Sequence, residues 1–176
     1  DQFGFVVKTT AAAASTNYAH IVAANSTLTT TIDGSTPAIE VRAVLSDGTV
    51  GVYKVALTKD SAGAYTITKL GTSVPTTGAA AVKAVADALV IKNYGYTLSE
   101  TTITLEGLTA AASANFTTGA VYEVGSLSGL GTGVTSATAS SISKTVLVNA
   151  ATKYVVYDSD KKTATVYTGN SGLPAN

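Results

Sequence analysis

The sequence of 176 residues contains no cysteine, no methionine, no tryptophan and a single histidine, His20. Without thiols the chain has no disulfide, no thiolate nucleophile and no cysteine ligand for zinc or an iron–sulfur cluster. Charged residues make up only 12% of the chain, about half the usual share of roughly 25%. The 11 basic and 11 acidic side chains balance, so charge gives no reason to expect nucleic acid or an anionic membrane as a partner. No segment approaches the roughly 20 apolar residues of a membrane span.

Small side chains dominate instead, because Thr, Ala, Val, Ser and Gly together occupy 111 of the 176 positions. This composition is typical of extracellular or cell-surface β proteins rather than of cytosolic enzymes. The length predicts one ordinary domain, or at most two small ones. The chain begins with Asp1 and shows no export signal, so we expect a fragment of a longer, processed protein. We therefore interpret residues 1–176 as a single β-rich module of a larger surface protein.

Short runs of β-branched and aromatic residues predict about ten strands. In residues 38–45, Ile39, Val41 and Ala43 alternate with Glu40, Arg42 and Val44, the period of a strand with one buried face. We expect residues 3–9 and 18–24 to form a first hairpin. Further strands are expected at 49–57, 64–70, 95–100, 101–106, 120–124, 144–148, 153–158 and 163–169.

Asp47-Gly48 separates two of these alternating runs and predicts a hairpin, because Gly tolerates the positive φ that tight turns require. Gly78–Leu89 has apolar residues at helical spacing and predicts the one amphipathic helix, with Lys83 and Asp87 on its polar face. Residues 125–143 carry no charge and little periodicity, so we expect a flexible loop. The predicted fold is mainly β: an antiparallel meander or partly closed, barrel-like domain with one short helix at about 78–89.

Three segments resemble the β-rich regions that follow the S-layer homology (SLH) repeats in surface-layer proteins of Gram-positive bacteria. They are the opening Phe3-Gly4-Phe5-Val6-Val7, the hairpin Val41–Val50, and the tail Tyr154–Pro174 with Val166-Tyr167-Thr168-Gly169 and Leu173-Pro174. The resemblance implies an extracellular location at the bacterial cell wall and a structural protein. The family has no catalytic residues to transfer to this chain. It also implies that any attachment to cell-wall polymer lies in parts outside this chain.

His20 is the first candidate for chemistry. A general base needs an orienting partner, and a zinc site needs further nitrogen or sulfur ligands that this chain lacks. We therefore expect a structural or surface role for it. The chain has no G-x-S-x-G motif, and the Gly-rich run Gly125–Gly131 lacks the lysine of a phosphate-binding loop. We predict no catalytic, cofactor-binding or metal-binding residues, and no cofactor.

Asp158-Ser159-Asp160 has alternating carboxylates, as calcium loops do, but Lys161 and Lys162 follow directly and would repel a cation. A solvated turn is the favoured interpretation, and calcium binding at Asp158 and Asp160 is the open alternative. The sequons at Asn25 and Asn115 are expected by chance in a chain this rich in Ser and Thr. The tyrosines lie mostly in predicted strands, and we expect them to pack across strands.

The favoured function is a non-catalytic structural module that provides rigid spacing and lateral contacts. Its expected partners are neighbouring surface-protein domains or copies of itself, without nucleic acid or a membrane span. The alternative is a module that binds carbohydrate or cell-wall polymer, for which tyrosines exposed in a row would be the sign. An enzyme or a protease inhibitor is the least favoured class, because no set of residues in the sequence supports either.

Overall fold

The computed structural model describes residues 2–7, 17–67, 70, 72–90, 92–107, 121–124, 136–139, 144–147, 150 and 152–169. The chain divides into two compact units. The first, here called the terminal unit, comprises Asp1–Tyr18, Leu45–Val50 and Thr109–Asn176. The second, here called the barrel unit, comprises Ala19–Val44 and Gly51–Leu108. The predicted mainly β, barrel-like fold with one short helix is confirmed.

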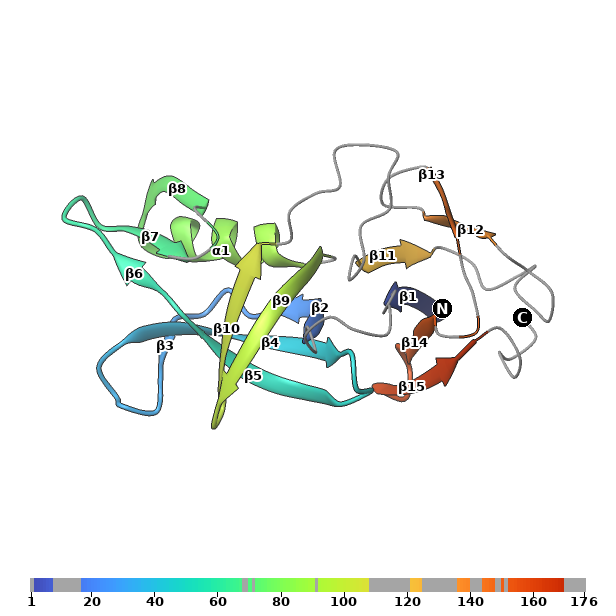
Figure 1. Cartoon of the computed structure of the whole chain (residues 1–176). Helices are drawn as coiled ribbons and strands as arrows, with labels where there is room; N and C mark the ends of the chain where they lie inside the picture. The colour runs from blue at the N-terminus through green and yellow to red at the C-terminus, as the bar shows by residue number, and fades with distance from the viewer. Residues whose placement is uncertain are drawn as a thin grey trace. The chain divides into compact units, whose positions relative to one another are not determined.

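The barrel unit is built on a closed sheet of five strands (Figure 1). They are β2 (Tyr18–Ala24), β4 (Pro37–Leu45), β5 (Val50–Ala56), β9 (Lys92–Ser99) and β10 (Thr102–Gly107). The order around the barrel is β2-β9-β10-β5-β4, and β4 returns to β2, while the short β3 (Thr29–Thr30) extends the sheet beyond β4. Closure removes the free sheet edges that would otherwise pair with other chains.

One strand pair of the barrel is parallel, which the sequence pattern did not predict. β10 pairs with β5 in parallel, with Thr102 opposite Lys54, whereas β9 and β10 form an antiparallel hairpin. A parallel neighbour needs a crossover, and the chain between β5 and β9 supplies it with a small sheet and the helix. A five-stranded Greek-key barrel with this order and a helix between its third and fourth strands has the topology of an OB-fold.

The alternation predicted for residues 38–45 is confirmed in β4. Ile39, Val41 and Ala43 are buried, while Glu40 and Arg42 are partly exposed on the opposite face. Val44 is buried as well, so both faces of the strand are covered at its end. Burial of each large aliphatic side chain contributes about 1.5–3 kcal/mol, which fixes the register of β4 against a one-residue slip.

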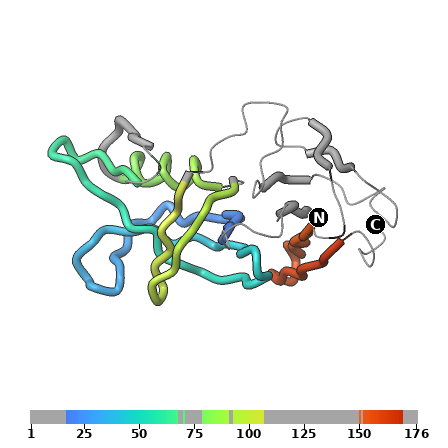
Figure 2. The backbone as a smooth tube through the Cα atoms, in the orientation of Figure 1, coloured from blue at the N-terminus to red at the C-terminus, as the bar shows by residue number. Residues whose placement is uncertain are grey.

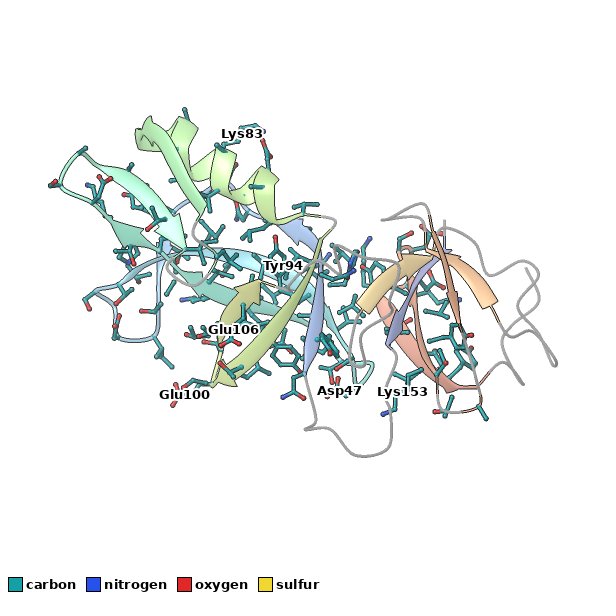
Figure 3. All side chains as sticks on the ribbon, turned by 45° about the horizontal axis from the view of Figure 1, so that its top comes forward. Asp47, Lys83, Tyr94, Glu100, Glu106 and Lys153 are labelled. Atoms are coloured by element: carbon teal, nitrogen blue, oxygen red, sulfur yellow. The ribbon has the colours of Figure 1, made fainter. Side chains whose placement is uncertain are left out.

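The helix α1 spans Gly78–Leu89, as predicted. It crosses from the crossover sheet of β6 (Thr58–Lys59), β7 (Ala64–Ile67) and β8 (Thr72–Thr77) to β9. Lys83 pairs with Asp87 on its exposed face (Figure 3). Tyr94 is 7% exposed, and its hydroxyl lies 3.4 Å from the Leu89 carbonyl oxygen in the last helical turn. Burial raises the pKa of Tyr94 to about 12. The buried face of α1 is formed by Ala81, Val82, Val85, Ala86 and Leu89.

The terminal unit contains a four-stranded antiparallel sheet in the order β11-β1-β14-β15. Its strands are β11 (Val121–Val124), β1 (Gln2–Val7), β14 (Lys153–Asp158) and β15 (Thr163–Thr168). The β14–β15 hairpin was predicted, but the expected first hairpin is wrong. β1 pairs with β11 and β14, and β2 belongs to the barrel. The alternation in residues 3–7 identifies a strand but not its partner, and the partner here comes from the far end of the chain.

Four short strands lie outside the predicted set. β3 and β6 have two residues each, and β8 contains Pro75, which lies in an outer strand of its three-stranded sheet, where proline is tolerated. β12 (Ser136–Ala139) lies within the segment expected to be a loop and pairs with β13 (Lys144–Leu147). Small neutral residues give a weak strand signal, which is why β12 was missed.

The β4–β5 turn contains the predicted positive-φ glycine. Gly48 has a φ of +91°, and its amide donates to the Leu45 carbonyl oxygen at 2.9 Å. Leu45 in turn donates to the Thr49 carbonyl oxygen, so the loop has three residues with the glycine last, a common hairpin form. A Cβ on Gly48 would lie 3.0 Å from Cγ2 of Val166 on β15. The position therefore requires glycine both for its φ and for its space. Figure 2 shows the turn as the link between β4 and β5.

Replacing Gly48 with alanine is expected to lower the free energy of unfolding by about 2–3 kcal/mol, through positive-φ strain and the contact with Val166. Gly34 is the matched control, because it also follows an aspartate and has a φ of +71°, but nothing lies within 4 Å of its Cβ position. Gly34→Ala is expected to cost about 1 kcal/mol, from φ strain alone. Denaturant unfolding of both variants measures the difference. Equal costs would show that the Val166 contact contributes nothing.

Candidate functional site

The best-defined exposed feature of the barrel unit is the turn Thr31–Thr36, here called the Asp33 turn. One carboxylate oxygen of Asp33 accepts hydrogen bonds from the Thr31 hydroxyl at 2.6 Å and from the amides of Ser35 and Thr36 at 2.9 and 3.0 Å. The other accepts from the Thr36 hydroxyl at 2.8 Å. Gly34 donates to the Thr31 carbonyl oxygen at 3.0 Å. One side chain thus organises the whole turn.

These bonds lower the pKa of Asp33, and the turn that they form carries the exposed apolar side chain of Ile32. The Thr31 hydroxyl, followed by the donors on Thr36 and Ser35, holds the pKa of Asp33 well below its usual range. The turn therefore carries a fixed negative charge. Beside it, Ile32 is 68% exposed, the largest exposed fraction among the large apolar side chains of the described residues. Figure 2 shows this part of the chain as a blue loop that projects from the barrel strands.

A cavity of about 260 Å³ lies next to the end of the Asp33 turn, where Thr36 forms part of its wall. The cavity begins just past the Thr102–Lys54 pairing, and successive residues of β5 and β10 line its two sides. Five of its six apolar wall residues are each no more than 5% exposed: Val55, Leu57, Ile67, Ile103 and Leu105. The sixth, Ala56, is partly exposed. Thr36, Thr58 and Thr104 supply its polar atoms, together with the backbone. A space with so few polar partners suits an apolar group better than ordered water.

His20 lies on β2 and is buried. Its side chain is 1% exposed, and Nδ1 lies 2.7 Å from Oδ1 of Asn93 on the neighbouring strand β9. Because a carbonyl oxygen only accepts, the imidazole donates from Nδ1. The sequence predicted a structural or surface role for His20, and its burial excludes the surface position. The partner Asn93 was not recognised from the sequence, since 73 positions separate the two residues.

The tyrosines are mostly inside the protein. Tyr154 faces Tyr167 across the β14–β15 pair, and Tyr96 faces Leu105 across the β9–β10 pair, as cross-strand packing predicts. Tyr53 and Tyr167 are partly exposed, and the side chain of Tyr122 lies outside the described residues. No row of exposed tyrosines occurs in the part of the chain that the structure describes. The buried tyrosines are Tyr18, Tyr65, Tyr94, Tyr96, Tyr154 and Tyr157.

The proposed calcium position at Asp158 and Asp160 forms the β14–β15 turn. One oxygen of Asp158 accepts from the amides of Asp160 and Lys161, both at 3.0 Å, and the other lies 3.0 Å from the Lys161 ammonium. These bonds, the Lys161 amide first, lower the pKa of Asp158. Within the described residues, no group of three or more His, Asp or Glu side chains is arranged to hold a metal ion. The carboxylate acts here as a turn acceptor.

A shallow groove of about 280 Å³ follows the outer face of β2, β4 and β5. Asn25, Glu40 and Arg42 give it hydrogen-bonding groups, and Val52, which is 53% exposed, gives it an apolar patch. The alternation of β4 had placed Glu40 and Arg42 on one face. The neighbouring strands that complete the groove are known only from the tertiary structure.

The remaining sequence candidates carry no site. Asn25 of the first sequon accepts the Thr27 amide at 2.9 Å and forms a local turn. The second sequon, at Asn115, and the Gly-rich run 125–131 lie outside the described residues. No helix in the described ranges is both long and apolar enough to cross a membrane. Comparisons with protein-family models, curated proteins and solved structures found no match to this chain.

The Asp33 turn gives a pH-dependent prediction. At pH 7 we expect Asp33→Asn to be less stable than the wild type, because the amide replaces an anionic acceptor of four hydrogen bonds. The folded pKa of Asp33 lies below its unfolded value of about 4, so its contribution is present above pH 4 and is lost as the pH falls toward the folded pKa.

Thermal melts of the wild type and of Asp33→Asn from pH 7 to pH 2 are therefore expected to converge below about pH 4. Ser35→Ala is the control, because Ser35 contributes its amide and not its hydroxyl to the turn. We expect this variant to follow the wild-type profile. A stability gap between Asp33→Asn and the wild type that stays constant with pH would contradict the assigned role of the carboxylate.

The His20–Asn93 bond gives a second prediction. Asn93→Leu removes the acceptor at Nδ1 of a buried imidazole and is expected to lower the free energy of unfolding by about 1–3 kcal/mol. Thr97→Leu, at an exposed position of the same strand, is the control and is expected to change it by less than about 0.5 kcal/mol. Denaturant titration measures both. Similar losses in the two variants would mean that the bond adds nothing specific.

Proposed function

We propose that this chain is a non-catalytic structural module of a bacterial cell-surface protein of the S-layer type, which provides rigid spacing and lateral contacts. One observation carries the proposal: in four of the described turns, an aspartate carboxylate accepts backbone amides of its own turn. Asp47 accepts the Thr49 amide at 2.8 Å, and Asp60 accepts the amides of Ala62 and Ala64 at 2.9 Å. Asp33 and Asp158 do the same in their own turns.

Carboxylates that accept the amides of their own turns favour a structural role over a catalytic one. A catalytic pair of carboxylates needs two groups converging on one cleft, with environments that separate their pKa values. Here Asp33 and Asp158 lie at separate turns, and hydrogen bonds lower the pKa of both. The side-chain bonds instead restrict the loops, which are the parts of a β protein that move most readily. A spacer module requires this rigidity.

Composition and charge support the same function. The equal numbers of 11 basic and 11 acidic side chains leave no net charge to oppose close approach of neighbouring copies. The abundance of Thr, Ser, Ala, Val and Gly and the resemblance to S-layer proteins place the module outside the cell in this proposal. Its partners are copies of itself or neighbouring surface domains, and cell-wall polymer is reached through other parts of the parent protein.

The second candidate is binding of carbohydrate or cell-wall polymer, and the groove on β4 and β5 favours it. OB-fold barrels bind oligosaccharides and oligonucleotides on the corresponding face, although fold alone does not determine function. Arg42, Glu40 and Asn25 offer the hydrogen bonds that a sugar requires. The burial of six tyrosines argues against it, because aromatic stacking platforms were the expected sign of this function.

Calorimetric titration with peptidoglycan fragments and secondary wall polymers, combined with a panel of hydrolase substrates, separates the two candidates. A structural module is expected to give neither turnover nor binding heat. Turnover that disappears in a His20 or carboxylate variant would overturn the proposal in favour of an enzyme. Binding that Arg42→Ala weakens at least about tenfold, while Lys83→Ala on α1 leaves it unchanged, would favour the carbohydrate-binding alternative.

A further inference from the structure

The proposed function requires a surface for lateral contacts, and this inference rests on that proposal. The barrel unit offers two complementary features, which are an exposed apolar side chain on a hydrogen-bonded turn and a cavity lined mainly by apolar side chains. The side chain is Ile32, and the cavity is the one between β5 and β10. Both belong to the same unit, and Thr36 is shared by the turn and the cavity wall.

Ile32 differs from the other exposed apolar residues in how it is held. Single exposed apolar side chains are common and need no explanation. Ile32, however, lies between Thr31 and Asp33, within the network of four hydrogen bonds to the Asp33 carboxylate. The Lys54 ammonium also bonds the Thr30 carbonyl oxygen at 2.7 Å, at the base of the turn. A side chain on a pre-organised turn loses little conformational entropy when a partner covers it.

The cavity has the properties of a receiving site for a branched aliphatic side chain. Its volume of about 260 Å³ exceeds the roughly 150 Å³ of an apolar cavity that stays dry and admits benzene. Valine, leucine and isoleucine side chains form most of the wall, so an aliphatic group would gain dispersion contacts on several sides. Three threonines add little polarity.

The residues that directly follow Ile32 and the cavity-lining Thr58 carry charges of opposite sign. Asp33 follows Ile32 directly, and its lowered pKa keeps it anionic. Lys59 follows the cavity-lining Thr58 directly, and its exposed ammonium lies 5.8 Å from the centre of the Tyr65 ring. An aspartate beside the inserted side chain and a lysine beside the cavity attract across a contact between two copies.

We propose that Ile32 of one copy inserts into the cavity between β5 and β10 of a second copy, with Asp33 facing Lys59 of that copy. Because the turn and the cavity adjoin at Thr36, a twofold arrangement can satisfy both contacts at once, one from each chain. A contact of this size is small, so each pairing is weak in solution.

Sedimentation equilibrium of the full chain over a range of concentrations tests this contact. The wild type is expected to approach the mass of a dimer reversibly, and Ile32→Asp to weaken dimerisation at least about tenfold. Ala56→Leu, which places extra methyl groups at the cavity wall, is expected to have the same effect. The controls are Val52→Asp, at another exposed apolar position, and Ala62→Leu, in the β6–β7 turn, and both are expected to associate like the wild type. Thermal melts confirm that all variants are folded.

The outcomes separate this contact from the proposed function. A wild type that stays monomeric, or an Ile32→Asp variant that associates normally, overturns the contact but leaves a structural module that assembles elsewhere. Loss of association in Ile32→Asp but not in Ala56→Leu overturns the cavity as the receiving site. A cavity that takes up free benzene while the protein stays monomeric also overturns the contact, in favour of a small apolar ligand. Failure of the proposed function appears separately, as turnover or polymer binding.

Discussion

Pairing of Thr102 with Lys54 is the interaction on which the barrel depends. It joins β10 to β5, and with the pairing of β2 and β4 it closes five strands into a barrel. Because the two strands are parallel, the chain between them must cross over, and the crossover contains β6, β7, β8 and α1. The cavity begins where the walls of β5 and β10 continue past this pairing. Closure therefore requires the crossover that contains the helix, and it brings together the two strands that line the cavity.

The second principle of the structure is the repeated use of aspartate to hold turns. Asp33, Asp47, Asp60 and Asp158 each accept backbone amides from residues two to four positions ahead. A carboxylate can satisfy several donors at once, so one residue replaces the regular hydrogen bonds that a turn lacks. Four of the chain's 11 acidic side chains thus stabilise its own turns.

Much of the fold could be predicted from the sequence, because part of the information is local. The alternation around Val41, the helical spacing from Gly78 to Leu89 and the Asp47-Gly48 turn are each encoded within about a dozen residues, and each was confirmed. The prediction of a first hairpin was wrong because the pairing of a strand is not encoded locally. A strand such as Gln2–Val7 has the same alternation whatever its partner, and its partners lie more than a hundred positions away.

The sequence by itself determined the class of the fold: a mainly β chain with little charge and one short helix. Only the tertiary structure decided which residues meet. His20 and Asn93 lie on strands that become neighbours when the barrel closes, and the wall of the cavity joins Leu57 to Leu105. Nothing in the sequence distinguishes Ile32 from the other apolar residues. Its exposure depends on where its turn lies in the fold. Local patterns fix strands and turns through backbone geometry, whereas contacts between distant segments arise only from packing the whole chain.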